Sequence, residues 1–347
     1  MTSKERVAAI FNGELPDRVP MWHGLSTEFI AKALGETGLP DEEALRVRMA
    51  DDFRRIHASY DLPEETLAEG VVYRTVFGVN RMGEGYGQPV GHVLSDVSLS
   101  EIHDYPWPDP ACVNVSTLRE QAAPWKESYS ILGGDWSPLW HDAIDLMGME
   151  TLYMRMYDEP EAVDALLTHL TDFYAASCRK IFDEAGDLID VFFMGNDLGS
   201  QTGPLMGPEQ FERFILPHLK RLIDLAHDYG LKTQLHCCGG IYPLIPMLID
   251  AGLDALHALQ PDCHGMGLRE LKDAYGNRIV LNGAIDSHHT LINGNPDKVH
   301  TDVQKVLAVM KPGGRYIAGA SHDWVLEQTP VENMLEMVDA VQEFGTY

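Results

Sequence analysis

The chain alternates short apolar runs of strand character with amphipathic runs of helical periodicity, and this alternation limits its possible folds more than any other feature. Such alternation is typical of parallel α/β proteins, because parallel strands are joined by helical crossovers. We expect eight strands, at Val19–Trp22, Val71–Val79, Tyr129–Trp136, Ile189–Asp197, Lys232–Cys237, Leu253–Leu259, Arg278–Ala284 and Arg315–Ser321. Eight such units in 347 residues predict an α/β fold, a (β/α)₈ TIM barrel. We expect residues 1–347 to form a single domain with an N-terminal helical extension.

Helices are expected between these runs. The first should begin with Ser3 as its N-cap and end before Gly13. Helical periodicity predicts others at Glu42–Ala58, Pro160–Glu184, Pro208–His227, Tyr242–Ala251, Gly267–Tyr275 and Pro330–Phe344. The Gly-rich segment Arg81–His92 is expected to be a long loop or a hairpin.

Charge and cysteine content exclude several classes of protein. Lys and Arg total 26 against 53 Asp and Glu, a formal charge of −27, which disfavours binding to nucleic acid or to an anionic membrane. No apolar stretch is long enough to span a membrane, and we do not expect the N-terminal residues to be a secretory signal. Five cysteines are too few, and odd in number, for a disulfide framework. We therefore expect a cytoplasmic protein; the sequence leaves a homo-oligomer open.

Polar side chains gather where the expected strands end. In a barrel of this kind, catalytic residues come from the carboxyl ends of the strands. The candidates at these ends are Trp22, His23, Arg81, Glu84, Asp135, Trp136, Asn196, Asp197, His236, Cys237, Cys238, His257, Gln260, Asn282, Asp286, Ser321, His322 and Asp323.

The segment His236-Cys237-Cys238 is the most informative of these. Side chains two residues apart on a strand point the same way, so His236 and Cys238 should face the barrel mouth and Cys237 the other side. Imidazole nitrogen and thiolate sulfur are preferred zinc ligands, and His322 is the best placed third ligand. In the alternative interpretation, His236 is a hydrogen-bonded barrel histidine and both cysteines are packing residues.

Asp197 and the residues around the mouth are the other candidates. Asp197 could orient a metal ligand, act as an acid or base, or contact substrate; alternatively it caps the turn after its strand. We take Asp197 and His236 as the catalytic candidates. Trp136 would form a pocket wall or simply pack. The expected substrate-binding residues are Trp22, His23, Trp136, Asn196, Gln260 and Asn282.

Several stretches carry a family resemblance, namely VPMW (19–22), GGDWS (133–137), DLGSQTGPLMGPEQFERFILPHLKRL (197–222), LHCCG (235–239), DAGLDAL (250–256), LNGAID (281–286), PGGRYIAGASH (312–322) and TPVENM (329–334). Over nearly its whole length the chain resembles the uroporphyrinogen decarboxylase superfamily, which implies the (β/α)₈ barrel. True decarboxylases follow the first strand with an RQAGR segment and end strand two with an aspartate. This chain has WHGLSTEF at 22–29, and its expected strand two ends VFGVN.

The cobalamin-dependent methyltransferases are the branch that the chain resembles more closely. They imply a zinc site with a His-x-Cys pair after strand five, which His236 and Cys238 match, and a cysteine after strand eight, where this chain has His322. Decarboxylases also place a histidine there, so His322 could be a metal ligand or a decarboxylase-type histidine. The resemblance implies a methyl donor or thiol as substrate and a corrinoid (cobalamin) carried on a separate protein. The alternatives are a decarboxylase-like lyase and a non-catalytic protein that binds a tetrapyrrole or corrinoid.

Overall fold

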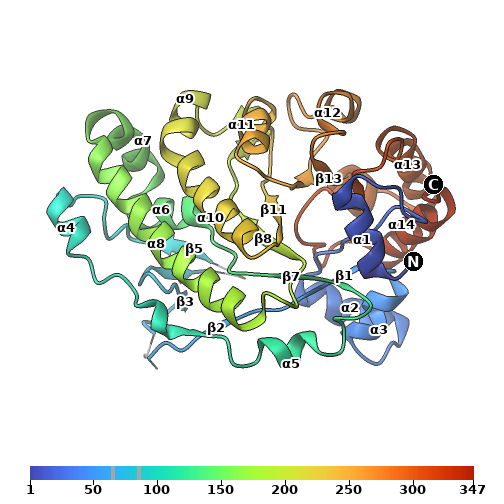
Figure 1. Cartoon of the computed structure of the whole chain (residues 1–347), viewed down its shortest axis with the longest axis horizontal. Coiled ribbons are helices and arrows are strands. Elements are labelled where there is room, and N and C mark those ends of the chain that lie inside the picture. Colours follow the sequence, from blue (N-terminus) through green and yellow to red (C-terminus); the bar gives the residue numbers. More distant parts are fainter. Residues whose placement is uncertain (64–66, 84–86) are drawn as a thin grey trace.

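Seven parallel strands form the central sheet of the computed structural model, which describes residues 1–63, 67–83 and 87–347. Consecutive strands of this sheet are neighbours in space, in the order β1 (Phe53–Arg55), β7 (Ser130–Gly133), β8 (Val191–Gly195), β11 (Lys232–His236), β12 (Ala255–Leu259), β13 (Val280–Ile285) and β14 (Tyr316–Ala320). All but β1 overlap expected strands, and Figure 1 shows the sheet curling among the helices. This is a TIM-barrel-like α/β fold.

The helices follow the expected alternation. They are α1 (Ser3–Asn12), α2 (Thr27–Thr37), α3 (Glu42–Arg48), α4 (Leu99–His103), α5 (Leu118–Ala122), α6 (Leu139–Met147), α7 (Met149–Asp158), α8 (Pro160–Ala185), α9 (Pro208–Gln210), α10 (Leu216–Asp228), α11 (Ile245–Asp250), α12 (Leu268–Tyr275), α13 (Pro296–Met310) and α14 (Val331–Phe344). The side chain that caps α1 belongs to Thr2 rather than Ser3. A π-helical turn, Phe211–Ile215, lies before Pro217, which lacks the N–H that a regular helix would use. No helix in the described ranges is long and apolar enough to cross a membrane.

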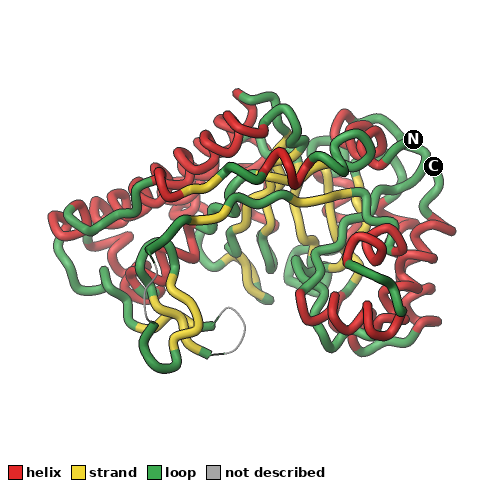
Figure 2. Tube along the Cα trace, turned by 90° about the horizontal axis from the view of Figure 1, so that it is seen from below, coloured by secondary structure: helices red, strands yellow, loops and turns green. Residues whose placement is uncertain are grey.

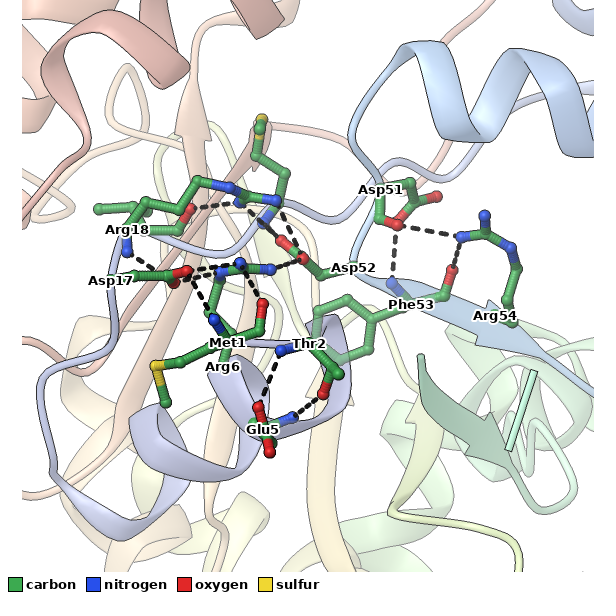
Figure 3. A network of polar contacts seen from close by, with 12 residues as sticks. Met1, Thr2, Glu5, Arg6, Asp17, Arg18, Asp51, Asp52, Phe53 and Arg54 are labelled. Carbon is green, nitrogen blue, oxygen red and sulfur yellow. Dashed lines mark hydrogen bonds and ion pairs between the residues drawn. The ribbon is translucent and has the colours of Figure 1, made fainter. Parts of the chain in front are cut away.

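The expected first strand is reduced to a bridge that joins the two edges of the sheet. Met21 pairs in parallel with Ala318 of β14, and the Met21 carbonyl accepts a hydrogen bond of 3.0 Å from the N–H of Asp52, next to β1. The carboxylate of Asp52 in turn accepts a hydrogen bond of 2.8 Å from the Met21 N–H. Arg6 and Arg18 also bind this carboxylate, in the polar network that Figure 3 shows. Asp52 therefore ties the first segment of the chain to the second strand.

The expectation that Val71–Val79 forms the second barrel strand was wrong. The second strand is β1, which lies inside a range expected to be helical, because α3 ends at Arg48 and Ala50 has a positive φ of 50°. Residues 71–74 form β3 of a separate antiparallel sheet with β4 (Asn80–Met82) and β5 (Gln88–Val90). Figure 2 shows this sheet standing apart from the barrel strands. A β-branched apolar run indicates a strand but not the sheet to which it belongs.

The segment between β1 and β7, and the loops after the later strands, contain further short elements. They are the antiparallel pairs β2 (Ser59–Tyr60) with β6 (Val113–Asn114) and β9 (Gly199–Ser200) with β10 (Gly203–Pro204), the short helical turns Pro110–Cys112 and Tyr242–Leu244, and the π-helical turn Ser287–Ile292. The expected strand-end residue Glu84 lies outside the described residues, and β4 and β5 lie in the segment expected to be a loop or hairpin.

The inside of the curled sheet is filled by one apolar cluster. Helix α1 contributes Val7, Ile10 and Phe11 to this cluster, so it covers the amino ends of the strands. The cluster also holds Trp22, which follows the bridge at Met21, and the strand residues Phe53, Leu132, Val191, Phe193, Ala255, Val280 and Ile317. With the amino end covered in this way, the carboxyl ends of the strands are left to form the site.

Burial of Asp142 predicts a pH-dependent stability. This α6 carboxyl accepts a hydrogen bond from the Tyr174 hydroxyl, yet burial raises its pKa to about 7. Between pH about 4 and about 7, the unfolded chain releases this proton while the folded chain keeps it, so the free energy of unfolding should fall as pH rises. In the wild-type protein the free energy of unfolding should fall by an amount on the order of 1–3 kcal/mol between pH 5 and 8, and in Asp142→Asn this fall should be absent. Urea unfolding at the two pH values measures it. An unchanged difference between the two pH values would contradict this assignment.

Candidate functional site

Three metal-capable side chains meet at the carboxyl ends of β8 and β11. His236 ends β11, and its Nε2 lies 3.4 Å from Cys238 Sγ and 3.3 Å from Asp197 Oδ1. The three ligand atoms all lie within 4.8 Å of one another. We call Asp197, His236 and Cys238 the donor group. Nitrogen, sulfur and carboxylate oxygen together are a set that suits zinc, so the residues present fit that ion.

Asp197 holds the donor group in place. Its Oδ1 accepts a hydrogen bond of 2.8 Å from the Cys238 N–H, and its Oδ2 lies 3.3 Å from His141 Nε2. Burial favours the neutral acid, but hydrogen bonds with His141 and His236 outweigh it and lower the pKa of Asp197. Burial likewise opposes the charge of His236, yet Asp197 raises its pKa overall. Burial, followed by the charge of Asp197, raises the pKa of the Cys238 thiol. The site thus combines an anionic carboxylate with a thiol that needs a cation to ionise.

A second set of donors shares His236. His236 Nδ1 lies 3.1 Å from His257 Nδ1, and His257 Nδ1 lies 4.0 Å from Asp323 Oδ1. That Asp323 oxygen is buried and has no hydrogen-bond partner in the part of the chain that the structure describes. A buried carboxylate oxygen without a partner is costly, so its presence beside the donor group also fits a bound cation.

Cys237 faces the opposite way from Cys238. Its Sγ accepts a hydrogen bond of 3.3 Å from the Leu198 N–H, and its side chain is buried in the apolar layer between sheet and helices. The alternation of side chains thus continues just past the end of β11 and separates the two adjacent cysteines, only one of which reaches the donor group.

His322 does not join the donor group. Its Nδ1 contacts the backbone of Trp324, 2.9 Å from the carbonyl oxygen and 3.2 Å from the nitrogen. It lines a cavity of about 480 Å³ together with Gln260 and the vicinal pair His288 and His289. Within the described ranges, neither set of clustered donors includes His322.

The other expected site residues divide into two sets. Trp136 stacks on the His236 ring at 5.7 Å between centroids, and Gln260 connects the Gly239 N–H to the Ser321 carbonyl at the mouth. Trp22 lies in the inner core, edge-on to Phe193. The polar atoms of Asn196, Asn282 and His23 are directed into the protein instead. Asn196 accepts a hydrogen bond from the Trp140 N–H and donates one to the Ser137 carbonyl. Asn282 donates a hydrogen bond to the Gln234 side chain, and the His23 ring contacts the Met49 carbonyl.

Two residues that the sequence analysis did not single out stand at the site. His141 of α6 contacts Asp197, and the guanidinium of Arg55, which ends β1, lies over Trp136 and Phe193. The corrected second strand thus ends in an arginine where true decarboxylases are expected to have an aspartate. Three residues are too short a run for hydrophobic periodicity to reveal β1, so no sequence signal pointed to Arg55.

The fold and the donor group define a class: a TIM-barrel-like α/β protein with a candidate metal centre at the carboxyl edge of its sheet. Its sequence then defines the family. The chain belongs to the uroporphyrinogen decarboxylase (URO-D) family, whose profile matches residues 94–344. The resemblance on which the sequence analysis relied is thereby confirmed.

Methyltransferases and decarboxylases are both among the relatives of this chain. The chain is 24% identical over 194 residues to methylcobamide:CoM methyltransferase MtbA of Methanosarcina acetivorans, covering 55% of this chain and 52% of that protein. It is 23% identical over 283 residues to uroporphyrinogen decarboxylase of Pseudoalteromonas atlantica, covering 76% of this chain and 72% of that one. The chain thus spans about half the length of the first of these relatives. A solved methyltransferase from Methanosarcina mazei has the same fold, with a TM-score of 0.69 at 20% identity over 99% of both chains.

Proposed function

We propose that this chain transfers a methyl group between a small substrate and a corrinoid carried on a separate protein, with zinc held by the donor group. The observation that carries the proposal is the close packing of Asp197, His236 and Cys238 at the strand ends. The similarity to MtbA, named a methylcobamide:CoM methyltransferase, supports the same reaction class with a thiol acceptor. Zinc bound there would stabilise negative charge on the sulfur or oxygen of the substrate.

The protein's own residues would position the substrate and carry its proton. Trp136, stacked on His236, gives an apolar wall beside the donor group. His141 lies against Asp197 and its side chain is 42% exposed, so it can pass a proton from the site to solvent. As zinc ligands we favour Asp197, His236 and Cys238. The expected ligand His322 would first have to leave the Trp324 backbone.

The alternative, a decarboxylase-like lyase, is disfavoured by the end of strand two. Arg55 puts a cation where a decarboxylase needs a carboxylate for pyrrole nitrogens, and WHGLSTEF at 22–29 contains no arginine. A non-catalytic corrinoid-binding protein would not need three metal donors packed together.

A spectroscopic assay tests the reaction. Mixed with methylcobalamin and small thiols, or with a reduced corrinoid protein and methyl ethers, the zinc-loaded protein should change the cobalt absorbance at a rate proportional to its concentration. Asp197→Asn should lower that rate by about 100-fold, since it removes the negative charge that would bind the metal and that faces His141. Release of carbon dioxide from uroporphyrinogen at a comparable rate would overturn the proposal in favour of the lyase.

A further inference from the structure

Asn196 connects two segments of the chain that carry residues of the site. It directly follows β8 and is fully buried. Its backbone N–H donates a hydrogen bond of 2.9 Å to the carbonyl of His236. Its side-chain oxygen accepts one of 2.9 Å from the Trp140 N–H, and its side-chain nitrogen donates one of 3.1 Å to the Ser137 carbonyl. Both ends of the amide therefore bind backbone groups, and a side chain without exposed surface cannot contact a substrate.

The start of α6 depends on the Asn196 side chain. The first N–H groups of a helix have no acceptor within the helix, and the residue before α6 is Pro138, which does not cap it with its side chain. Asn196 accepts from one of these groups, the Trp140 N–H. Ser137, whose carbonyl Asn196 binds, has a positive φ of 50°, a conformation that a residue with a side chain keeps only when its surroundings hold it. Asn196 thus supplies the capping contact that α6 lacks at its own N-terminus.

The residue after Trp140 in α6 is the one that reaches the donor group. His141 Nε2 lies 3.3 Å from Asp197 Oδ2. His141 Nδ1 is buried and has no hydrogen-bond partner among the described residues. No second hydrogen bond therefore anchors the ring, and the position of α6 determines where it lies. The two residues that follow β8 thus contact two consecutive residues of α6, and the first contact fixes the helix that carries the second.

We propose that Asn196 is a positioning residue of the metal centre: it holds the first turn of α6 so that His141 meets Asp197. This inference rests on the zinc site of the function proposed above. Asp197 Oδ1 faces His236 and the Cys238 N–H, while Oδ2 faces His141, so the His141 contact fixes how the carboxylate is turned. A partner that orients a metal ligand contributes about 10–100-fold to metal affinity. Asn196 therefore raises the affinity for zinc through His141, without touching the ion.

A double-mutant cycle on zinc affinity tests this inference. Competition with a chromogenic chelator measures the affinity of the whole protein for zinc. We expect Asn196→Ala and His141→Ala each to lower it by about 10-fold or more. The double variant should lose no more than His141→Ala alone, because Asn196 acts through His141. Asn333→Ala is the matched control: Asn333 is equally buried, its side chain donates to the carbonyls of Leu291 and Gly294, and its replacement should leave zinc affinity unchanged.

Hydrogen exchange in the metal-free protein gives a second measurement, which does not depend on zinc. Asn196→Ala should speed exchange of the Trp140 amide by about 10-fold or more, because this N–H loses its acceptor, and should leave the last turn of α6 unchanged. If Asn196→Ala does not fold, Asn196→Ser replaces it, since one hydroxyl cannot occupy both positions of the amide.

The outcomes separate this inference from the proposed function. Unchanged zinc affinity in Asn196→Ala or in His141→Ala overturns the inference. A double variant that binds zinc more weakly than His141→Ala also overturns it, because Asn196 would then act on Asp197 directly. Unchanged exchange at Trp140 shows that Asn196 does not hold α6 and overturns it as well. A wild-type protein without affinity for zinc overturns the zinc site, and exchange at Trp140 then decides the hold on α6 alone. Zinc affinity that follows the cycle without any methyl transfer overturns the reaction and leaves Asn196 its role.

Discussion

Replacing Cys238 with Ala should release zinc from the protein and abolish methyl transfer, while replacing Cys237 with Ala should change neither. Cys238 Sγ lies 3.4 Å from His236 Nε2, whereas Cys237 Sγ binds the Leu198 N–H on the far side of the strand. Loss of a partner that only supports a metal ligand costs about 10–100-fold in affinity, so loss of a ligand should exceed this. Metal content after dialysis, measured by plasma emission spectrometry, gives the result without relying on activity.

Cys237→Ala is a matched control, because it removes a neighbouring thiol of the same kind from the same segment after β11. Two further variants decide the third ligand: Asp197→Asn should lower zinc content, and His322→Ala should leave it unchanged. Zinc retained in Cys238→Ala but lost in Cys237→Ala would mean that β11 has the opposite register. Zinc lost in His322→Ala would restore the ligand set expected from the sequence.

The donor group shows which parts of a site follow from sequence. The period of two along a strand is enough to place His236 and Cys238 on one side and Cys237 on the other. Asp197 was a candidate because it directly follows an apolar strand. The position of His322 could not be predicted in this way, because it lies beyond the end of β14, where loop conformation sets the side-chain direction.

The fold was predictable wherever a strand is long and apolar. The strands from β7 to β14 in the central sheet are buried on both faces, and their sequences show it. Strand β1 is three residues long, and two of them are arginines: Arg54 lies over the Tyr129 ring at 3.8 Å and pairs with Glu43, and Arg55 lies at the mouth. Tertiary contacts rather than propensity make this segment a strand, so the sequence favours residues 71–79, with their stronger β-propensity, as the second strand.

The second large effect concerns the closure of the sheet by Asp52. Its carboxylate is fully buried and accepts hydrogen bonds from Arg6 Nη1 at 2.6 Å, Arg18 Nη1 at 2.8 Å and the Met21 N–H at 2.8 Å (Figure 3). Three residues thus converge on one anion at the point where the first segment of the chain meets β1, and Arg18 donates a second hydrogen bond from Nη2 at 3.1 Å. Arg6 is itself 7% exposed, so it cannot regain its hydration if the anion is removed.

We therefore expect Asp52→Asn to destabilise the protein by about 3–5 kcal/mol, because it breaks a buried ion pair on one side and leaves Arg6 with only the partly exposed carboxylate of Asp17. The amide keeps the shape of the carboxylate but turns an N–H₂ toward donors that need an acceptor. Asp187→Asn, which breaks the exposed pair with Arg119, should cost about 1 kcal/mol or less. Urea unfolding at pH 7 compares the two variants with the wild type. Equal urea midpoints for both variants would show that the Met21 bridge forms without help from the Asp52 carboxylate. Apolar packing of α1 against the amino ends of the strands would then be the interaction that stabilises this end of the sheet.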